Sequence, residues 1–266
     1  MYKVCKRSSR KGPHIVLVGG IHGDETRSIC ELDDLIRMRE IYGGSVQLVA
    51  GNPEALAVGK RYVDADLNRA FPGDPNSAVY EERLACELLR ELAKCDFVLD
   101  VHTTTAKTPP LIITTRVDAE VIGFIQNIPF RHVIYMGQQL AKGGSLIDRV
   151  LGVSLEFCQG ELPHTIQNVV GHILTNLGLC LGDRTEVEQE MYEVYSILRV
   201  GDLTGADHVD LQNMVETELN GERFYPVLFG ERHYLGEGIV CLKARKNPDL
   251  GSSTINPYAP IRTLGK

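Results

Sequence analysis

The sequence lacks three features that would place it early in a particular class of protein. Its seven cysteines are odd in number and scattered, and no two are spaced as Cys-x-x-Cys, which argues against a disulfide framework and a thiolate zinc cluster. No apolar run approaches the roughly 18 residues of a membrane-spanning helix. There is no excess of positive charge either, since the formal net charge is −7, and this gives no general attraction for nucleic acid or an anionic membrane.

These absences direct attention to a local site. The first 14 residues carry charges but no apolar stretch behind them, so we expect a cytoplasmic protein with reduced thiols rather than an exported one. Its expected partner is a small molecule, and any anionic substrate must be held by individual Arg or Lys side chains. A homodimer is compatible with the sequence.

What is present is the alternation of an α/β protein. Apolar runs at 14–20, 46–51 and 97–102 read as buried strands. Amphipathic stretches at 26–42 and 79–95 separate them and read as helices that pack on a sheet. With 266 residues, of which 43% are hydrophobic, the chain is long enough for one large core and a smaller second unit.

The texture of the sequence changes near residue 187. After that point, short strand-like runs at 191–203, 223–230 and 238–244 are separated by Gly, Asp, Asn and Pro. We therefore expect a domain over residues 1–187 and a smaller β-rich domain over residues 188–266.

The first candidate site follows the apolar run at 14–20, where a glycine-rich turn carries His22 and Glu25. The carboxyl ends of strands are where open α/β sheets form their sites, and glycine allows the sharp turn that brings an imidazole and a carboxylate together. Both groups are good zinc ligands. The HxxE spacing by itself is weak evidence for a metal site and, without further context, favours a turn that carries surface charges.

The second candidate is His102, which ends the apolar run at 97–102 and can supply a third metal ligand. Asp100 is two residues earlier and shares its face of an extended strand. It is placed to orient a liganding histidine from behind, and we expect that histidine to be His22. The alternative is that Asp100 and His102 only pair with each other at a strand end.

The segment 61–73 mixes charged, amide and aromatic groups in a way that no simple helix or strand needs. Planar guanidinium and amide groups bind carboxylates by paired hydrogen bonds. Arg61, Asn68 and Arg69 are therefore candidates for binding an anionic substrate or polarising its carbonyl. The alternative is a surface loop with internal ion pairs, in which Asp64 and Asp66 would take part.

Glu156 lies in the apolar segment 152–160. A carboxylate there is costly unless it is paired or has a chemical role. Burial would raise its pKa, so that it could act first as a general base and then as an acid toward a leaving amine. The alternative is a structural glutamate at a strand end.

Read in order, the segments GGIHGDE (19–25), RYVDADLNRAFPG (61–73), DVHTTT (100–105) and the surroundings of Glu156 resemble the aspartoacylase and succinylglutamate desuccinylase family, relatives of the zinc carboxypeptidases. The segment 225–234 resembles the one that supplies a substrate-contacting tyrosine. The resemblance implies a zinc carboxypeptidase-like mixed sheet flanked by helices, with a β-rich C-terminal domain that caps the active-site entrance.

The resemblance also implies roles for individual residues. His22, Glu25 and His102 match the ligands of one zinc ion per chain, Glu156 the general base, and Arg61 the arginine that polarises the scissile carbonyl. Asn68, Arg69 and Tyr234 match substrate-binding residues. The implied reaction is zinc-dependent hydrolysis of the amide bond of a small N-acyl amino acid, which releases a carboxylate and a free amino acid.

One departure from the aspartoacylase pattern leaves the substrate open. Aspartoacylases carry an arginine shortly before the catalytic glutamate to hold the substrate's side-chain carboxylate, and here the segment 143–146 (GGSL) takes that place, with Arg149 close but not aligned. N-acetylaspartate, succinylglutamate and other N-acyl amino acids are all compatible with the sequence. A zinc carboxypeptidase, an esterase and a non-catalytic binding protein of the same fold are the alternative functions, and His233 beside Tyr234 has no assigned role.

Overall fold

The computed structural model describes residues 2–137, 143–203 and 210–251. Its strands are β1 (Lys3–Arg7), β2 (His14–Gly19), β3 (Ser45–Ala50), β4 (Phe97–Thr104), β5 (Leu111–Thr114), β6 (His132–Tyr135), β7 (Gly152–Cys158), β8 (Glu190–Arg199), β9 (Thr217–Leu219), β10 (Glu222–Val227) and β11 (Ile239–Lys246). Its α-helices are α1 (Thr26–Met38), α2 (Pro53–Val58), α3 (Tyr80–Leu92), α4 (Ala119–Ile125), α6 (Thr165–Asn176) and α7 (Arg232–Gly236). Four short 3₁₀ turns are η1 (Leu67–Arg69), η2 (Leu146–Asp148), η3 (Val200–Leu203) and η4 (Pro248–Gly251).

The strands form one mixed sheet in the order β1-β3-β2-β4-β7-β5-β6-β8-β11-β10-β9. Strands β3, β2, β4 and β7 are parallel neighbours, as are β5, β6 and β8. Strand β7 pairs with β5 in the antiparallel sense, and the last four strands are antiparallel. The parallel strands β2, β4 and β7 therefore bring their carboxyl ends to the same edge of the sheet, where the candidate residues lie.

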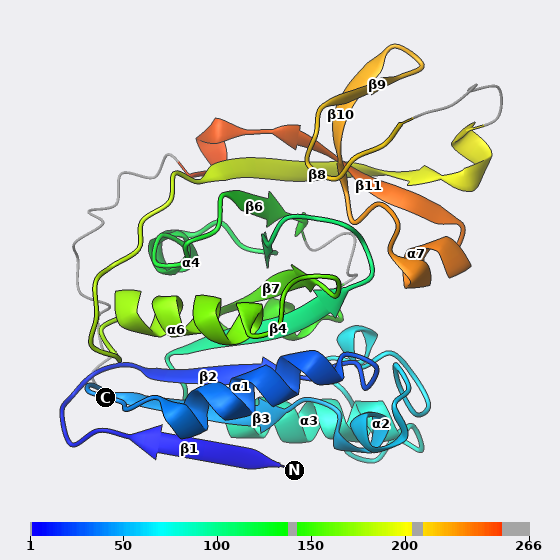
Figure 1. Ribbon diagram of the computed structural model, residues 1–266. Helices are drawn as coiled ribbons and strands as arrows, with labels where there is room; N and C mark the ends of the chain where they lie inside the picture. Colours follow the sequence, from blue (N-terminus) through cyan, green and yellow to red (C-terminus); the bar gives the residue numbers. More distant parts are fainter. Residues whose placement is uncertain (1, 138–142, 204–209, 252–266) are drawn as a thin grey trace.

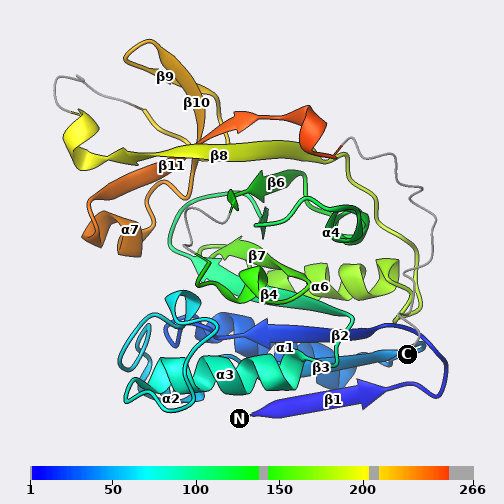
Figure 2. The ribbon, with the colours of Figure 1, turned by 180° about the vertical axis from the view of Figure 1, so that it is seen from behind.

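Helices cover both faces of the sheet (Figures 1 and 2). On one face, α1, α4 and α6 pack against the odd-numbered residues of β2, β4 and β7, such as Leu17, Leu99 and Leu155. On the other face, α3 packs against even-numbered residues such as Val16 and Val98. Strands that bury side chains on both faces read as continuous apolar runs, and this explains why the interior strands are evident in the sequence.

The C-terminal strands extend the same sheet. Strand β8 pairs with β6 along its first residues and with β11 from Tyr192 to Arg199. The four strands β8, β11, β10 and β9 form the upper end of the molecule in Figure 1. A separate apolar cluster joins this part to β5 and β6 through residues such as Ile113, Ile134 and Leu242. The two parts of the chain thus share a continuous sheet and an apolar contact.

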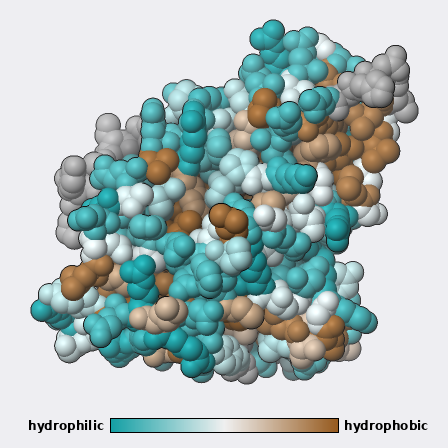
Figure 3. Space-filling model, viewed as in Figure 1, coloured by the Kyte–Doolittle hydropathy of each residue, from teal (hydrophilic) through white to brown (hydrophobic). Residues whose placement is uncertain are grey.

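The predicted α/β class, with a large mixed sheet and flanking helices, is confirmed. Strand β1 was not predicted, because its sequence KVCKR alternates exposed and partly buried residues at the sheet edge, and charged edge strands carry little apolar signal. In the described ranges, no helix has both the length and the hydropathy to cross a membrane. Figure 3 shows a mostly hydrophilic face, with apolar side chains gathered over the end of β8 and α7.

Candidate active site

The turn after β2 is shaped by close packing against the following segment of the chain. Gly20 has a φ of 69°, which glycine adopts without steric cost. A Cβ at Gly23 would lie 2.1 Å from the backbone carbon of Ala55, so only glycine fits there. The amide of Gly23 donates to the carbonyl of Arg61. The turn that carries His22 and Glu25 is therefore fixed against the segment that carries Arg61.

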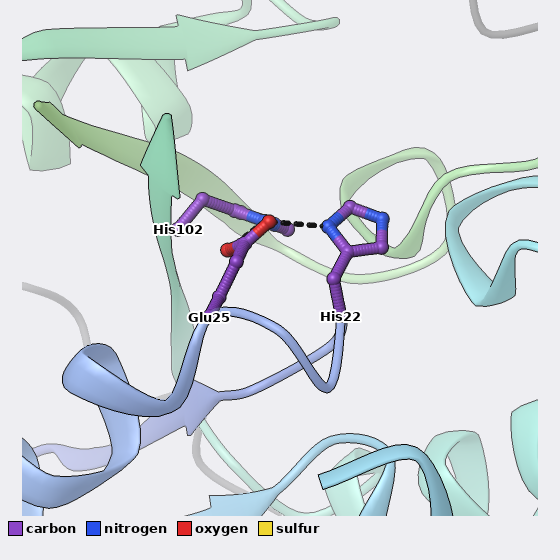
Figure 4. Close-up of side chains that lie close together, drawn as sticks. All are labelled: His22, Glu25 and His102. Atoms are coloured by element: carbon purple, nitrogen blue, oxygen red, sulfur yellow. Dashed lines mark hydrogen bonds and ion pairs between the residues drawn. The ribbon is translucent and has the colours of Figure 1, made fainter. Parts of the chain in front are cut away.

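His22, Glu25 and His102 converge at the carboxyl edge of the sheet (Figure 4). Nδ1 of His22 lies 2.5 Å from Oε1 of Glu25, and Nδ1 of His102 lies 3.2 Å from Oε2 of the same carboxylate. One ligand atom from each residue lies within 4.8 Å of the others, and all three side chains are buried. The three predicted metal ligands are thus brought together.

Each histidine is held from behind by an aspartate. Oδ2 of Asp100 lies 2.8 Å from Nε2 of His102, and Oδ1 of Asp66 lies 3.2 Å from Nε2 of His22. The expected pairing of Asp100 with His22 is therefore wrong: Asp100 and His102 project from the same face of β4 and meet directly. The ion pair of Asp66 with Arg61 agrees with the alternative interpretation of segment 61–73, whereas the contact of Asp66 with His22 was not predicted.

The carboxylates and imidazoles of this cluster stabilise one another's charged forms. Burial alone would lower the pKa of both histidines, but nearby carboxylates outweigh it, chiefly Glu25 for His22 and Asp100 for His102, and raise both. Burial would raise the pKa of Glu25, but the charges of His102 and His22 hold it well below its usual range. In the metal-free cluster, the carboxylates of Glu25, Asp66 and Asp100 therefore favour the protonated form of the two imidazoles.

The donor set fits a zinc ion. Two imidazoles and one carboxylate are a known combination for catalytic zinc, with the fourth position left for water or substrate. In a zinc site, each liganding histidine usually donates its other ring nitrogen to a carboxylate or carbonyl. His22 and His102 both present Nδ1 toward Glu25 and Nε2 toward an aspartate, so both rings are oriented as such ligands would be.

Glu156 lies on the neighbouring strand at the same level as His102. The two residues are register partners between β4 and β7, so their side chains point to the same face of the sheet. Within the described ranges no hydrogen bond or ion pair involves the Glu156 carboxylate, and burial raises its pKa to about 7. This is an unpaired carboxyl group that faces the cavity with a pKa suited to accepting and returning a proton.

The remaining predicted residues line the same cavity, which also contains the metal cluster and Glu156. Arg61 donates from Nε and one Nη to Asp66, over 3.2 and 3.0 Å. Asn68 lies 3.5 Å from Nε2 of His102 through Nδ2 and accepts from the amide of Leu146. The side chain of Arg69 is exposed. The hydroxyl of Tyr234 is buried, and this burial raises its pKa to about 12.

Two residues without an assigned role are now placed. His233 lines the cavity beside Tyr234 and lies 3.1 Å from Oε1 of Glu237. Arg149 is exposed, donates to the carbonyl of Gly143, and is not among the residues that line the cavity. The cavity therefore receives no side chain from Arg149.

Glu231 is a further residue near the site, and its role was not predicted from the sequence. Its carboxylate accepts hydrogen bonds from Thr104 and from the amide and hydroxyl of Thr105, just beyond His102. It also accepts from the amide of His233, as the cap of helix α7. The signal available in the sequence was the polar run after His102, whose three threonines need partners.

The fold and site together define an α/β protein with a candidate metal centre at the carboxyl edge of its sheet. Residues 11–163, more than half of the chain, match the model of the succinylglutamate desuccinylase/aspartoacylase catalytic domain. The chain belongs to the succinylglutamate desuccinylase/aspartoacylase family. The matched range contains the three candidate metal ligands, Arg61 and Glu156.

Individual relatives agree with this assignment. A probable aspartoacylase of Prochlorococcus marinus is 28% identical over 248 residues, which cover 82% of this chain and 78% of the relative. Several further curated relatives align over only 35–38% of their own length.

Two solved structures share the fold. Murine aminoacylase 3 has a TM-score of 0.64 at 21% identity, covering 90% of this chain and 97% of that one. A succinylglutamate desuccinylase/aspartoacylase from Rhodobacter sphaeroides has a TM-score of 0.68 at 17% identity, covering 93% and 88%. At these identities, the similarity concerns the fold alone.

Proposed function

We propose that this protein is a zinc-dependent amidohydrolase that cleaves the amide bond of a small N-acyl amino acid and releases a carboxylate and a free amino acid. The observation that carries the proposal is the position of the unpaired Glu156 carboxylate. Glu156 on β7 is the register partner of His102 on β4, and His102 belongs to the cluster with His22 and Glu25. A binding protein would need neither the buried carboxylate nor its raised pKa. The family assignment supports the same reaction type.

In this proposal His22, Glu25 and His102 hold the zinc ion. When bound, the ion supplies an activated water and a Lewis acid for the amide carbonyl. Asp66 and Asp100 keep the two imidazoles in the orientation that presents Nδ1. Because Glu25 has its pKa held low, it stays ionised throughout the neutral range.

Glu156 acts as the general base and then as the general acid. It removes a proton from the attacking water and returns it to the nitrogen of the departing amino acid, so that the leaving group is a neutral amine. The absence of any hydrogen bond to its carboxylate among the described residues leaves both oxygens free for these transfers.

Arg61, Asn68 and Arg69 position the substrate. Arg61 uses Nε and one Nη for Asp66, and a guanidinium has further N–H groups, so it retains donors for the scissile carbonyl. Arg69 and the amide of Asn68 lie on the adjoining turn η1 and are the proposed ligands of the substrate's carboxylate. Tyr234 comes from the C-terminal region 188–266, which we propose as the cap of the cavity entrance over a catalytic domain of residues 1–187.

The experiment that tests the proposal compares protein stripped of metal with the same sample reloaded with one equivalent of zinc. Release of free amino acid is measured from acetyl, succinyl and formyl derivatives of acidic and neutral amino acids, with dipeptides and simple esters as further arms. We expect hydrolysis of N-acyl amino acids only by the zinc-loaded sample. Zinc-dependent cleavage of dipeptides or esters alone would contradict the proposed substrate class, and no hydrolysis at all would contradict the proposed enzyme.

A further inference from the structure

One face of the sheet changes from polar to apolar on moving away from the candidate metal cluster. Register pairing places Asp100 of β4 beside Ser154 of β7, and Ser154 beside Ile113 of β5. Directly paired residues project to the same face. This row begins at Asp100, which contacts His102, and continues to Ser154, whose hydroxyl donates to Asp100. It ends at Ile113, which lines the cavity.

A second apolar surface faces the cavity from the C-terminal strands. Ile197 of β8 is the register partner of Leu242 of β11, and both line the cavity. Leu228, which follows β10, and Ile147 of η2 line it as well. Apart from Ile197, which is partly buried, these side chains are almost fully buried, so they form a packed apolar wall along one part of the cavity.

The charged groups of the cavity are distributed unevenly. Arg61 and Arg69 come from the segment after α2, next to the metal cluster. Arg199 is exposed at the end of β8, where it is the register partner of Ile239. Arg199 is thus two residues from Ile197 on the same strand, but it is exposed, and no arginine or lysine among the described lining residues is buried. Among the described residues, a second carboxylate of a substrate placed against Ile113, Ile147 and Leu242 would find no buried arginine or lysine as a partner, and burying an unpaired carboxylate is costly.

The cavity as a whole has room for a substrate with a group larger than a methyl. Its volume is about 430 Å³, within the range of roughly 300–1,000 Å³ that holds drug-sized ligands. A substrate of one carboxylate, one amide and one small acyl group would leave the aliphatic walls facing water. Apolar surface of this kind is better satisfied by an apolar part of a ligand.

We infer that the substrate of this enzyme is an N-acyl amino acid with a single carboxylate and a bulky apolar group, seated against Ile113, Ile147, Ile197 and Leu242. This inference rests on the proposed function and narrows its substrate class. The apolar group is either the acyl chain or the amino-acid side chain, since both flank the scissile amide. Acetyl and succinyl derivatives of Asp and Glu are poor substrates on this account.

The test uses the zinc-loaded protein and four substrates: N-acetyl-leucine, N-hexanoyl-glycine, N-acetylaspartate and N-succinylglutamate. A single methylene in an apolar pocket changes discrimination by about 10- to 200-fold. We expect kcat/KM for at least one apolar substrate to exceed that for both acidic substrates by about 100-fold or more. N-acetyl-leucine as the better apolar substrate assigns the pocket to the side chain, and N-hexanoyl-glycine assigns it to the acyl chain.

A binding measurement separates the two proposals. The zinc-loaded Glu156→Gln variant is titrated calorimetrically with the same four compounds, so that affinity is read without turnover. Tighter binding of the apolar compounds, with a negative heat-capacity change, supports the apolar pocket even if no hydrolysis is seen and the proposed reaction fails. Equal or tighter binding of N-acetylaspartate or N-succinylglutamate overturns the inference, and it does so whether or not these compounds are hydrolysed.

A variant pair locates the pocket. Ile197→Ser should lower the affinity for the apolar compound about tenfold or more, while leaving that for N-acetylaspartate within about twofold. The matched control is Ile41→Ser, which changes a partly buried isoleucine in a different apolar cluster. An equal effect of both variants, or none at Ile197, contradicts the assignment of the wall. Thermal unfolding of each variant identifies one that has failed to fold, in which case the milder Ile197→Val replaces it.

Discussion

Oδ1 of Asp66 lies 3.2 Å from Nε2 of His22, and Oδ2 of the same residue accepts two hydrogen bonds from the guanidinium of Arg61. One carboxylate thus connects a candidate metal ligand with the residue proposed to polarise the substrate carbonyl. Burial would raise the pKa of Asp66, but His22 and Arg61 hold it well below its usual range. Asp66 is therefore a permanent negative charge behind the metal site.

Asp66→Asn should weaken zinc binding, because an amide orients His22 less firmly and makes it a weaker ligand. Loss of such an outer carboxylate typically lowers metal affinity about 10- to 100-fold. Competition with a chromogenic chelator measures the change. The matched control is Asp64→Asn, an exposed residue whose carboxylate accepts from the amide of Tyr80 at the start of α3. Unchanged zinc affinity in the Asp66 variant would show that this aspartate serves Arg61 alone.

Zinc affinity should fall as the pH is lowered through the neutral range. The pKa values of His22 and His102 are raised in the metal-free protein, so protons compete with zinc for both imidazoles at higher pH than they would for a free histidine. Linkage predicts a loss of about tenfold in affinity per pH unit for each proton displaced. Glu25 has a lowered pKa and adds no proton in this range.

Calorimetric titration in two buffers with different ionisation enthalpies counts the released protons directly. We expect between one and two protons per zinc near neutral pH. Zinc binding that neither releases protons nor depends on pH would mean that the histidines are already neutral, and the charge balance described for the metal-free cluster would then be incorrect.

Glu156→Gln should lower kcat by about 10²- to 10⁴-fold, the usual contribution of a positioned acid–base group. Zinc content should be unchanged, because Glu156 is not among the three clustered ligands. In the wild type, activity should also fall as the pH drops through the pKa of Glu156, since the base must be ionised. The residual activity of the variant should lack that dependence.

The control for this variant is Glu161→Gln, the same substitution five residues along the chain at a half-buried site outside the cavity. It should retain wild-type turnover. Full activity of Glu156→Gln would remove this residue from the reaction and leave its raised pKa as a consequence of burial alone.

The parts of the site predicted from the sequence are those set by local geometry. Asp100 and His102 alternate along one strand, and His22 and Glu25 share one short turn, so their spacing already indicates that each pair can meet. The buried strands were predicted for a related reason, because burial on both faces leaves an uninterrupted apolar run. These features need no knowledge of how distant segments pack.

The features that sequence could not supply depend on tertiary contacts. Asp66 reaches His22 because the turn at Gly23 packs against the carbonyl of Arg61, and nothing in the sequence says that these segments touch. The pairing of Asp100 with His22 was wrong for a different reason, since the true partner, His102, is two residues away on the same strand and was considered only as the alternative. The apolar wall combines β5 with strands from the other end of the chain, so its residues read in sequence only as ordinary core positions.

Glu231 ties the C-terminal region to the end of β4, and its removal should disturb the substrate more than the metal. Its carboxylate accepts from Thr104, from Thr105 and from the amide of His233, so it fixes the start of α7, which carries His233 and Tyr234. Hydrogen bonds to a charged group contribute about 1.5–3 kcal/mol to stability. Glu231→Ala should lower the free energy of unfolding by about that amount and raise KM several-fold, with zinc affinity unchanged.

The three effects are measured by chemical denaturation, steady-state kinetics and chelator competition. Glu218→Ala serves as the control, because Glu218 forms an exposed ion pair with Arg223 on β10. A fall in kcat at constant KM would instead place Glu231 in the chemical step, since the positioning role described here acts on substrate binding.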